Sequence, residues 1–195
     1  IRKKWNIEKD SLVFVAAGRL TPQKGFDLLI DAVSKLNSTT KPFHILIAGT
    51  GKDRNQLINQ IEKNNLKSKV KLIGFQEDID SIFLSADYVI MPSRQEGMPN
   101  VVMESMSLGR PVLAANVNGV PELMEHLKTG YIFEPFNVDA ISKAIQFAIE
   151  NHGSEQISEW GVLAKKHIAT NFTIDRMIDK LEDYFYNQYS LNNRS

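Results

Sequence analysis

Two glutamates, Glu96 and Glu104, are separated by seven residues and follow the apolar run 88–91. This run predicts a buried strand, Gly97 and Pro99 predict a turn, and the apolar residues that recur after them predict a helix. Glu96 is therefore expected in the turn and Glu104 one turn inside the helix. A helix start after a parallel strand presents unpaired N–H groups and the positive end of the helix dipole, which favours phosphate or a polar sugar. Two carboxylates placed there need hydroxyl or cationic partners.

A second group of chemically useful residues follows the first apolar run, 12–17. It consists of Gly18-Arg19-Leu20 and, after a short polar stretch, Lys24-Gly25. An arginine can fork onto phosphate oxygens, a lysine can supply a point charge, and Gly18 allows close approach of the backbone. The residue types in this loop therefore predict a pyrophosphate-binding site.

Alternating strand and helix patterns surround these two groups. Continuous apolar runs predict parallel strands covered on both faces, and amphipathic stretches between them predict crossover helices. Strands are expected at 12–17, 44–48, 70–74, 88–91 and 112–115, with a short last strand at 130–133. Right-handed crossovers at these spacings predict one α/β domain with a Rossmann-like, doubly wound parallel sheet. Ligands of such sheets bind at the carboxyl ends of the strands, so the loops of interest are 18–25, 49–53, 74–78, 92–100 and 116–122.

Composition excludes several classes of function. The 195 residues, 43% of them hydrophobic, suit one domain with a full core. Lys plus Arg and Asp plus Glu both number 23, so no overall charge directs the protein to nucleic acid. The absence of Cys excludes thiol catalysis and fits the cytosol. No apolar segment approaches the ~20 residues of a membrane span.

The two ends of the chain predict its organisation. Residues 1–11 are polar and begin with Ile, as expected of a linker in a piece of a longer protein. Residues 12–172 form the predicted ligand-binding domain, with extra helices near 141–149 and 155–170. Residues 173–195 contain a last helix whose apolar stripe, Ile174 to Phe185, must pack against something.

Together these motifs resemble a known family. Glu96-Gly97 with the second acid at Glu104, the Gly-Arg-Leu and Lys-Gly loop, and the later Gly119-Val120-Pro121-Glu122 resemble retaining glycosyltransferases of the GT-B fold, of the group 1 or family four type. The resemblance extends from about residue 12 to about residue 150 and corresponds to the carboxy-terminal, donor-binding half of such an enzyme.

The resemblance implies a role for each motif residue. Arg19 and Lys24 are expected to bind the donor diphosphate, Phe75 to lie near the nucleotide base, and Glu104 to accept hydrogen bonds from ribose hydroxyls. Glu96 is the expected catalytic acid that faces the donor sugar. The expected donor-binding residues are Gly18, Arg19, Lys24, Gly49, Gly51, Phe75, Gly97, Met98, Asn100, Val101 and Glu104. No metal and no cofactor are expected, because the cations and helix N–H groups can stabilise the departing phosphate.

One residue departs from the family pattern. Many members have a second glycine where this chain has Pro99, and proline offers no N–H donor. Any amide contact to the sugar is then expected from Met98, Asn100 or Val101. The choice of sugar is the property that this change affects.

The predicted function is transfer of a sugar, with retention, from a nucleotide diphosphate-sugar, by default UDP, to a glycan or lipid-linked acceptor, as in bacterial polysaccharide biosynthesis. The acceptor domain is expected to precede this chain in the same protein, at the inner face of the membrane or in the cytoplasm. The isolated piece is expected to be inactive in transfer. A GT-B epimerase and a non-catalytic nucleotide-sugar-binding module stay open as alternatives. An NAD oxidoreductase is disfavoured because Arg54 occupies the third glycine position of the dinucleotide fingerprint.

Overall fold

The strands and helices alternate along most of the chain, as the apolar runs predict. The computed structural model describes residues 1–36 and 39–192, with side chains described as far as residue 186. The strands are β1 (Leu12–Ala17), β2 (Phe43–Ala48), β3 (Val70–Gly74), β4 (Tyr88–Met91), β5 (Val112–Ala115) and β6 (Tyr131–Phe133). The helices are η1 (Pro22–Lys24), α1 (Phe26–Ser34), α2 (Arg54–Lys63), α3 (Ile79–Ser85), α4 (Asn100–Ser107), α5 (Val120–Leu123), α6 (Val138–Glu150), α7 (Glu155–Asn171) and α8 (Ile174–Asn192).

The strands form one parallel sheet in the order β3-β2-β1-β4-β5-β6. The chain builds the sheet outward from β1 to β3, then returns to the other side of β1 to add β4. Phe14 pairs with Tyr88 and Val15 with Val89 at this reversal. The predicted doubly wound α/β fold is therefore confirmed, and the topological switch point lies between the carboxyl ends of β1 and β4.

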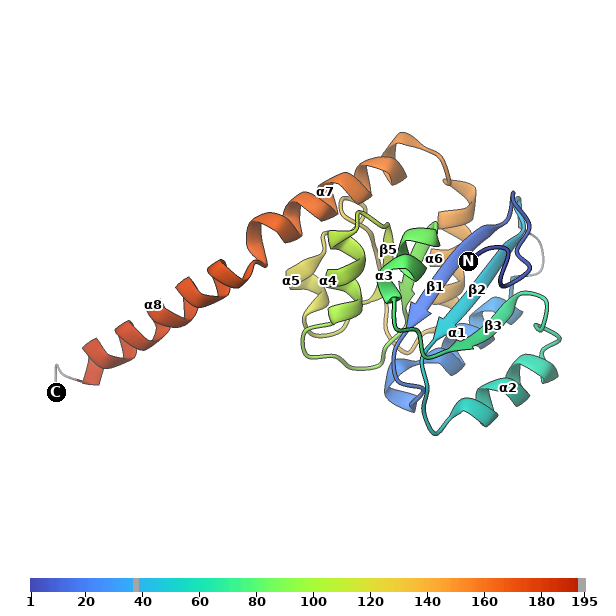
Figure 1. The fold of residues 1–195 in the computed structure, drawn as a ribbon, viewed down its shortest axis with the longest axis horizontal. Helices are drawn as coiled ribbons and strands as arrows, with labels where there is room; N and C mark the ends of the chain where they lie inside the picture. The colour runs from blue at the N-terminus through green and yellow to red at the C-terminus, as the bar shows by residue number, and fades with distance from the viewer. Residues whose placement is uncertain (37–38, 193–195) are drawn as a thin grey trace.

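Helices cover both faces of the sheet (Figure 1). Alternate strand residues contribute to two buried clusters, because successive side chains of a strand point to opposite faces. Phe14, Ile45 and Tyr88 pack in the cluster that contains residues of α1, α2 and α6. Val13 and Val89 pack in the other, with residues of α3, α4 and α5. Burial on both faces explains why the strands have continuous apolar sequences rather than alternating ones.

The first eleven residues pack against the domain. Ile7 is buried with the cluster on the α3 and α4 side. Arg2 donates to a carboxylate oxygen of Asp87 at 2.8 Å and to the backbone oxygen of Ser11 at 2.7 Å. The predicted role of this segment as a link to a second domain stays a prediction.

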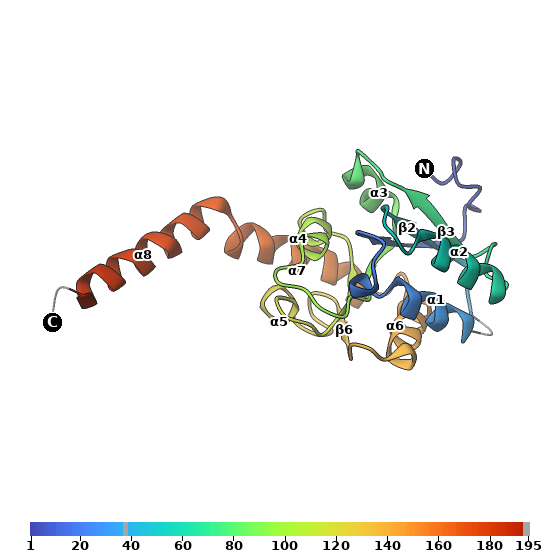
Figure 2. The same cartoon turned by 90° about the horizontal axis from the view of Figure 1, so that it is seen from below.

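The last helix leaves the body of the molecule. α8 continues beyond α7 and projects away from the sheet in both views (Figures 1 and 2). Its large apolar side chains are exposed: Ile174, Met177, Ile178, Leu181, Tyr184, Phe185 and Tyr186. Within residues 1–36 and 39–192, no helix has both the length and the apolar composition of a membrane span.

Two short helices were not predicted from the sequence. η1 follows Thr21, with Pro22 at its first position, and ends at Gly25 in a left-handed conformation. α5 begins after Gly119, again with a proline in its first turn. Both are too short for an apolar period to be visible, and proline is favoured in the first turn because its missing N–H is not needed there.

Candidate functional site

The loops that follow β1 and β4 are joined at the switch point. The backbone N–H of Arg94 donates to the Gln23 carbonyl at 2.8 Å, and the Gln23 side chain donates to the Gln95 carbonyl at 3.0 Å. Gly25, with a φ of 67°, lies so close to the end of β4 that a Cβ there would stand 2.0 Å from the Pro92 carbonyl oxygen. The two loops named by the sequence motifs thus form one unit.

Lys24 and Glu96, predicted as a phosphate ligand and a catalytic acid, are in direct contact. Lys24 Nζ lies 2.7 Å from Glu96 Oε1, and Ser93 Oγ donates to the same oxygen at 2.6 Å. The side chain of Glu96 is 9% exposed and that of Lys24 is 24% exposed. The acid is therefore held in place by a cation and a hydroxyl, and Lys24 can reach a phosphate only by exchanging this partner.

A second ion pair, absent from the sequence predictions, lies beside the first. Arg94 donates to both carboxylate oxygens of Asp27, at 2.7 and 2.6 Å. Arg94 also donates to the Pro22 carbonyl. Burial alone would raise the pKa of Asp27, but hydrogen bonding and charge from Arg94 hold that pKa below its ordinary value. No spacing rule links these two residues, so this contact could not be predicted from the sequence.

Gly49 and Gly51 allow the loop after β2 to pack against the loop after β1. A Cβ on Gly49 would stand 1.9 Å from the Gly18 carbonyl oxygen, and one on Gly51 would stand 2.3 Å from the Leu20 carbonyl oxygen. The Leu20 N–H donates to the Thr50 carbonyl at 2.8 Å. Close packing of two backbones is sufficient to require both glycines, and their predicted ligand contacts stay a prediction.

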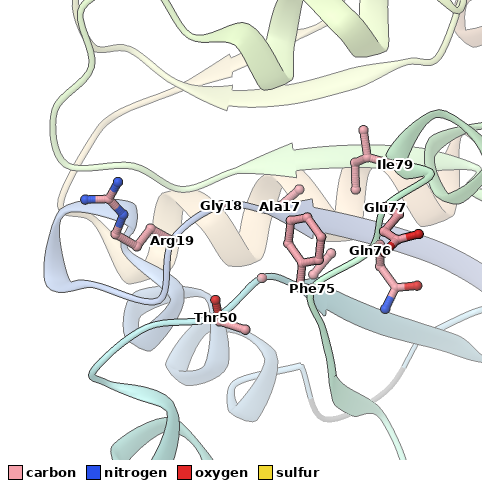
Figure 3. Close-up of a pocket in the computed structure, with 10 residues that line it drawn as sticks. Ala17, Gly18, Arg19, Thr50, Phe75, Gln76, Glu77 and Ile79 are labelled. Carbon is pink, nitrogen blue, oxygen red and sulfur yellow. The ribbon is translucent and has the colours of Figure 1, made fainter.

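A cavity of about 450 Å³ opens at the carboxyl ends of β1, β2 and β3. Phe75, 71% exposed, stands in it, with Arg19 and Thr50 on one side of its ring and Gln76 and Glu77 on the other (Figure 3). The residues that line the cavity are Ala17, Gly18, Arg19, Ala48, Gly49, Thr50, Phe75, Gln76, Glu77 and Ile79. Four predicted donor-binding residues, Gly18, Arg19, Gly49 and Phe75, are therefore brought together around one space.

The start of α4 offers backbone donors. Pro99 precedes the helix without a side-chain cap, and its carbonyl accepts from the N–H groups of Val102 and Met103 at 3.0 and 3.2 Å. The N–H groups of Asn100 and Val101 donate to no protein atom in the described part of the chain. Met98 and Gly97 are exposed beside them. The amides predicted as substitutes for the missing donor of Pro99 are thus available.

Glu104 is the fifth residue of α4 and is exposed, one turn inside the helix as predicted. Partial burial, and then the nearby Asp80 carboxylate, raise the pKa of Glu104. Glu104 does not line the cavity with Phe75. Its predicted contact with ribose hydroxyls stays a prediction.

Over residues 1–36 and 39–192, no three His, Cys, Asp or Glu side chains gather as the ligands of a metal ion would.

The parallel sheet, the loops joined at the switch point and the cavity beside them at the ends of β1, β2 and β3 define a Rossmann-like domain with a candidate ligand site. Residues 1–167 match the family described as glycosyl transferases group 1, so this chain belongs to that family. The predicted family is therefore confirmed, and with it the relation to the carboxy-terminal half of GT-B enzymes.

The chain is also similar to a curated protein in sequence and to solved structures in fold. It is 28% identical over 186 residues to the UDP-Gal:alpha-D-GlcNAc-diphosphoundecaprenol alpha-1,3-galactosyltransferase of Escherichia coli. The aligned region covers 92% of this chain and 46% of that protein. Its fold matches Anabaena HepE in complex with UDP-glucose (TM-score 0.84, 24% identity, 95% of this chain and 51% of that one). It also matches the C-terminal domain of LpcC, a glycosyl transferase group 1 family protein from Francisella tularensis (TM-score 0.75, 21% identity, 89% and 93%). The chain thus spans about half the length of the curated relatives it matches.

Proposed function

We propose that this chain is the donor-binding half of a retaining glycosyltransferase, and that it takes a uridine diphosphate sugar. The observation that carries the proposal is the joined pair of loops at the switch point, where a cation and an acid, Lys24 and Glu96, meet beside the cavity that holds Phe75 and Arg19. The E. coli relative is named for UDP-Gal and HepE is bound to UDP-glucose, which supports uridine as the base.

Each residue of the candidate site has a role in donor binding in this proposal. Phe75 offers an exposed ring on which the base can stack. Arg19 and Lys24 bind the diphosphate, together with the free amides of Asn100 and Val101 at the start of α4. The two cations and the amides also stabilise the negative charge that builds on the leaving diphosphate. These donors are preorganised, because the fold holds them in place before the reaction.

Glu96 faces the donor sugar in this proposal. When the diphosphate attracts Lys24, Glu96 loses a cationic partner and its carboxylate can accept hydrogen bonds from sugar hydroxyls. A carboxylate beside the anomeric carbon also stabilises positive charge as the bond to the diphosphate breaks. Departure of the diphosphate and attack by the acceptor on the same face would retain the configuration.

The rest of the enzyme lies outside this chain in the proposal. A glycan or lipid-linked acceptor binds to a domain that precedes residue 1, and α8 packs against that domain through its exposed apolar stripe. The name of the E. coli relative, with its lipid-linked diphosphoundecaprenol acceptor, supports an acceptor of this class. We place the enzyme in the cytoplasm, at the inner face of the membrane, where such acceptors are met.

The test is direct binding of UDP, GDP, ADP and NAD to this chain by isothermal titration calorimetry. Tighter binding of UDP than of the other three would support the proposal, and UDP-glucose should compete with UDP. Preference for NAD would contradict it and would indicate an oxidoreductase. Phe75→Ala tests the site of the base: it should weaken UDP binding by about 1–3 kcal/mol because the base loses its stacking partner.

A further inference from the structure

The ion pair between Asp27 and Arg94 joins the first turn of α1, which directly follows the loop that carries Lys24, to the loop that carries Glu96, and it does not line the cavity. Asp27 lies three residues after Lys24, and Arg94 lies two residues before Glu96. Asp27 is therefore close in the chain to Lys24, and Arg94 is close in the chain to Glu96.

The geometry of the contact fixes the loops in direction as well as in distance. The two guanidinium nitrogens of Arg94 each meet a different carboxylate oxygen of Asp27, at 2.7 and 2.6 Å. A planar, two-pronged contact of this kind restrains rotation as well as separation. The two side chains are only 24% and 32% exposed, so solvent and salt screen the pair less than a pair on the open surface.

Arg94 also contacts two backbone carbonyls of η1. Arg94 donates through its guanidinium to the Pro22 carbonyl and through its N–H to the Gln23 carbonyl. η1 carries Lys24 at its end. Any movement of Arg94 is thus transmitted to the segment that presents the cation of the site.

We propose that Asp27 and Arg94 are positioning residues that hold Lys24 and Glu96 at the separation at which one donor molecule can contact both. The inference rests on the proposed function, in which Lys24 binds the diphosphate and Glu96 faces the sugar. Loss of the contact leaves the cavity and Phe75 in place but lets the two loops move apart. A displacement of about 1 Å is enough to cost a large factor in binding or rate when two groups must act on one ligand.

A purely structural role makes a different prediction. Asp27 lies in the first turn of α1, where a negative charge favours the helix dipole. If that were its only task, Asp27→Asn would lower stability, Arg94→Gln would leave the helix dipole term untouched, and neither change would act selectively on the diphosphate.

The experiment is a double-mutant cycle on this chain, with UDP-glucose, UDP and uridine as the probes in calorimetry. Asp27→Asn and Arg94→Gln should each weaken UDP-glucose, which reaches both Lys24 and Glu96 in the proposal, by about tenfold, and should weaken UDP, which reaches only Lys24, by less. The double variant should be no weaker than either single one, because both changes remove the same contact. Uridine, which lacks the diphosphate, should change by less than about twofold. Arg94→Lys keeps the charge without the fork and should restore only part of the affinity.

The matched control is Asp139→Asn. It breaks another ion pair of the α1 region, Lys35 Nζ to Asp139 Oδ1 at 2.6 Å, which lies away from both loops. It should leave UDP and uridine binding unchanged. Equal weakening of UDP-glucose and uridine, or additive losses in the double variant, would overturn the inference.

A ligand-free measurement separates the inference from the proposed function. The amide resonances of Glu96 and Gly97 should shift in Asp27→Asn and that of Lys24 in Arg94→Gln, so that each change is detected across the contact, and all three should stay in place in Asp139→Asn. If these shifts occur and the unmodified chain binds no nucleoside diphosphate, the proposed function fails while the coupling of the loops stands. If UDP binds and the resonances do not move, the positioning role is wrong.

Discussion

At the scale of single residues, the proposed function gives the contact between Lys24 and Glu96 a consequence: binding of the diphosphate would be linked to binding of the sugar. Both charges are partly buried, and each satisfies the other. A diphosphate that attracts Lys24 must compete with Glu96, and the released carboxylate then requires new donors. Sugar hydroxyls are donors of the right kind. We therefore expect a nucleotide that carries a sugar to bind better than the nucleotide alone.

Arg19 and Lys24 should differ when each is replaced by alanine. Both changes should weaken UDP by about tenfold or more, because a charge-assisted contact of about 1.5–3 kcal/mol is lost, and both should spare uridine. Arg19 is exposed, so its loss should change the free energy of unfolding by less than about 0.5 kcal/mol. Lys24→Ala leaves the Glu96 carboxylate, 9% exposed, without its cation and should cost about 1–3 kcal/mol.

Calorimetry with UDP and uridine, together with urea denaturation, measures both quantities. Lys52→Ala, an exposed cation in the loop after β2 that does not line the cavity, is the control. Equal losses of UDP and uridine affinity in Arg19→Ala and Lys24→Ala would show that these side chains do not bind the diphosphate.

Glu104→Gln should raise the stability of the fold at neutral pH and weaken the binding of UDP. The pKa of Glu104 is raised by partial burial and by Asp80, so the folded chain binds its proton more tightly than the unfolded chain does. Stability from this group is present at low pH and is lost as pH rises from the ordinary glutamate value, 4.5, through the raised pKa. Removing the charge should therefore raise the thermal midpoint at pH 7 and leave it unchanged at pH 4.

The same variant should bind UDP about fivefold less tightly, because an amide accepts fewer hydrogen bonds from adjacent ribose hydroxyls than a carboxylate does. Affinity for 2′-deoxy-UDP should fall less. Melting curves at the two pH values and calorimetry with the two nucleotides provide the measurement. A lower midpoint at pH 7, or equal losses for both nucleotides, would contradict the assignment.

At the scale of elements, Gly25 sets how closely α1 and β4 approach. It ends η1 and begins α1 in a left-handed conformation, and a side chain there would meet the Pro92 carbonyl. Gly25→Ala should lower the free energy of unfolding by about 2–4 kcal/mol and also weaken UDP, since the loops that carry Lys24 and Glu96 are forced apart. Urea denaturation and calorimetry measure the two effects.

Gly153 offers the matched control for this change. It also has a positive φ, 87°, but a Cβ there would meet no atom within 4 Å. Gly153→Ala should therefore cost only the conformational penalty of about 1 kcal/mol and leave UDP binding intact. If the two variants proved equally stable, the close approach of Gly25 to β4 would not be what requires a glycine.

Much of the element scale could be predicted from the sequence. The apolar runs at 12–17, 70–74, 88–91 and 112–115 give the bounds of β1, β3, β4 and β5, because strands buried on both faces need unbroken apolar sequence. The placement of Glu104 in a helix is also confirmed, and Glu96 lies in the loop between β4 and α4, just before a bend at 97–98. These features depend on residues that are near in the chain, where periodicity and turn chemistry act.

The contacts between loops could not be predicted in the same way. Lys24 and Glu96 are 72 residues apart, as are the partners in several of the contacts around them, and only the return of the chain from β3 to β4 brings them together. Spacing rules do not encode such contacts. The Asp27–Arg94 pair was missed for this reason, although Arg94 stands in a loop that the motifs had marked and Asp27 lies two residues beyond another.

At the scale of the whole molecule, α8 contributes little to the stability of the domain. From Ile174 to Tyr186 its large apolar side chains are exposed, so few of them leave water on folding. A chain that ends at Thr173 should keep its free energy of unfolding within about 1 kcal/mol and bind UDP unchanged. Sedimentation should show less self-association for the shorter chain, because an exposed apolar stripe is removed. A large loss of stability would show that α8 packs against this domain in solution.

The last prediction concerns activity. The chain spans about half of the relatives it matches, and its sheet supplies one set of loops at the carboxyl ends of the strands. Transfer requires an acceptor hydroxyl held against the anomeric carbon, and holding two reactants together is worth about 7–11 kcal/mol of barrier. A domain that binds only the donor lacks this contribution.

We therefore expect this chain to bind UDP-sugars and to transfer no sugar faster than it hydrolyses the donor. The assay follows products by mass spectrometry with UDP-glucose and UDP-galactose as donors and glycan and lipid-linked diphosphate acceptors, beside a two-domain member of the family as positive control. Glu96→Gln should slow whatever donor hydrolysis is seen, because the carboxylate that stabilises positive charge at the anomeric carbon is lost, while UDP itself should still bind. Robust transfer by the chain alone would mean that the acceptor also binds at the carboxyl edge of this sheet, and the exposed residues around Met98 at the start of α4 would then be the place to seek it.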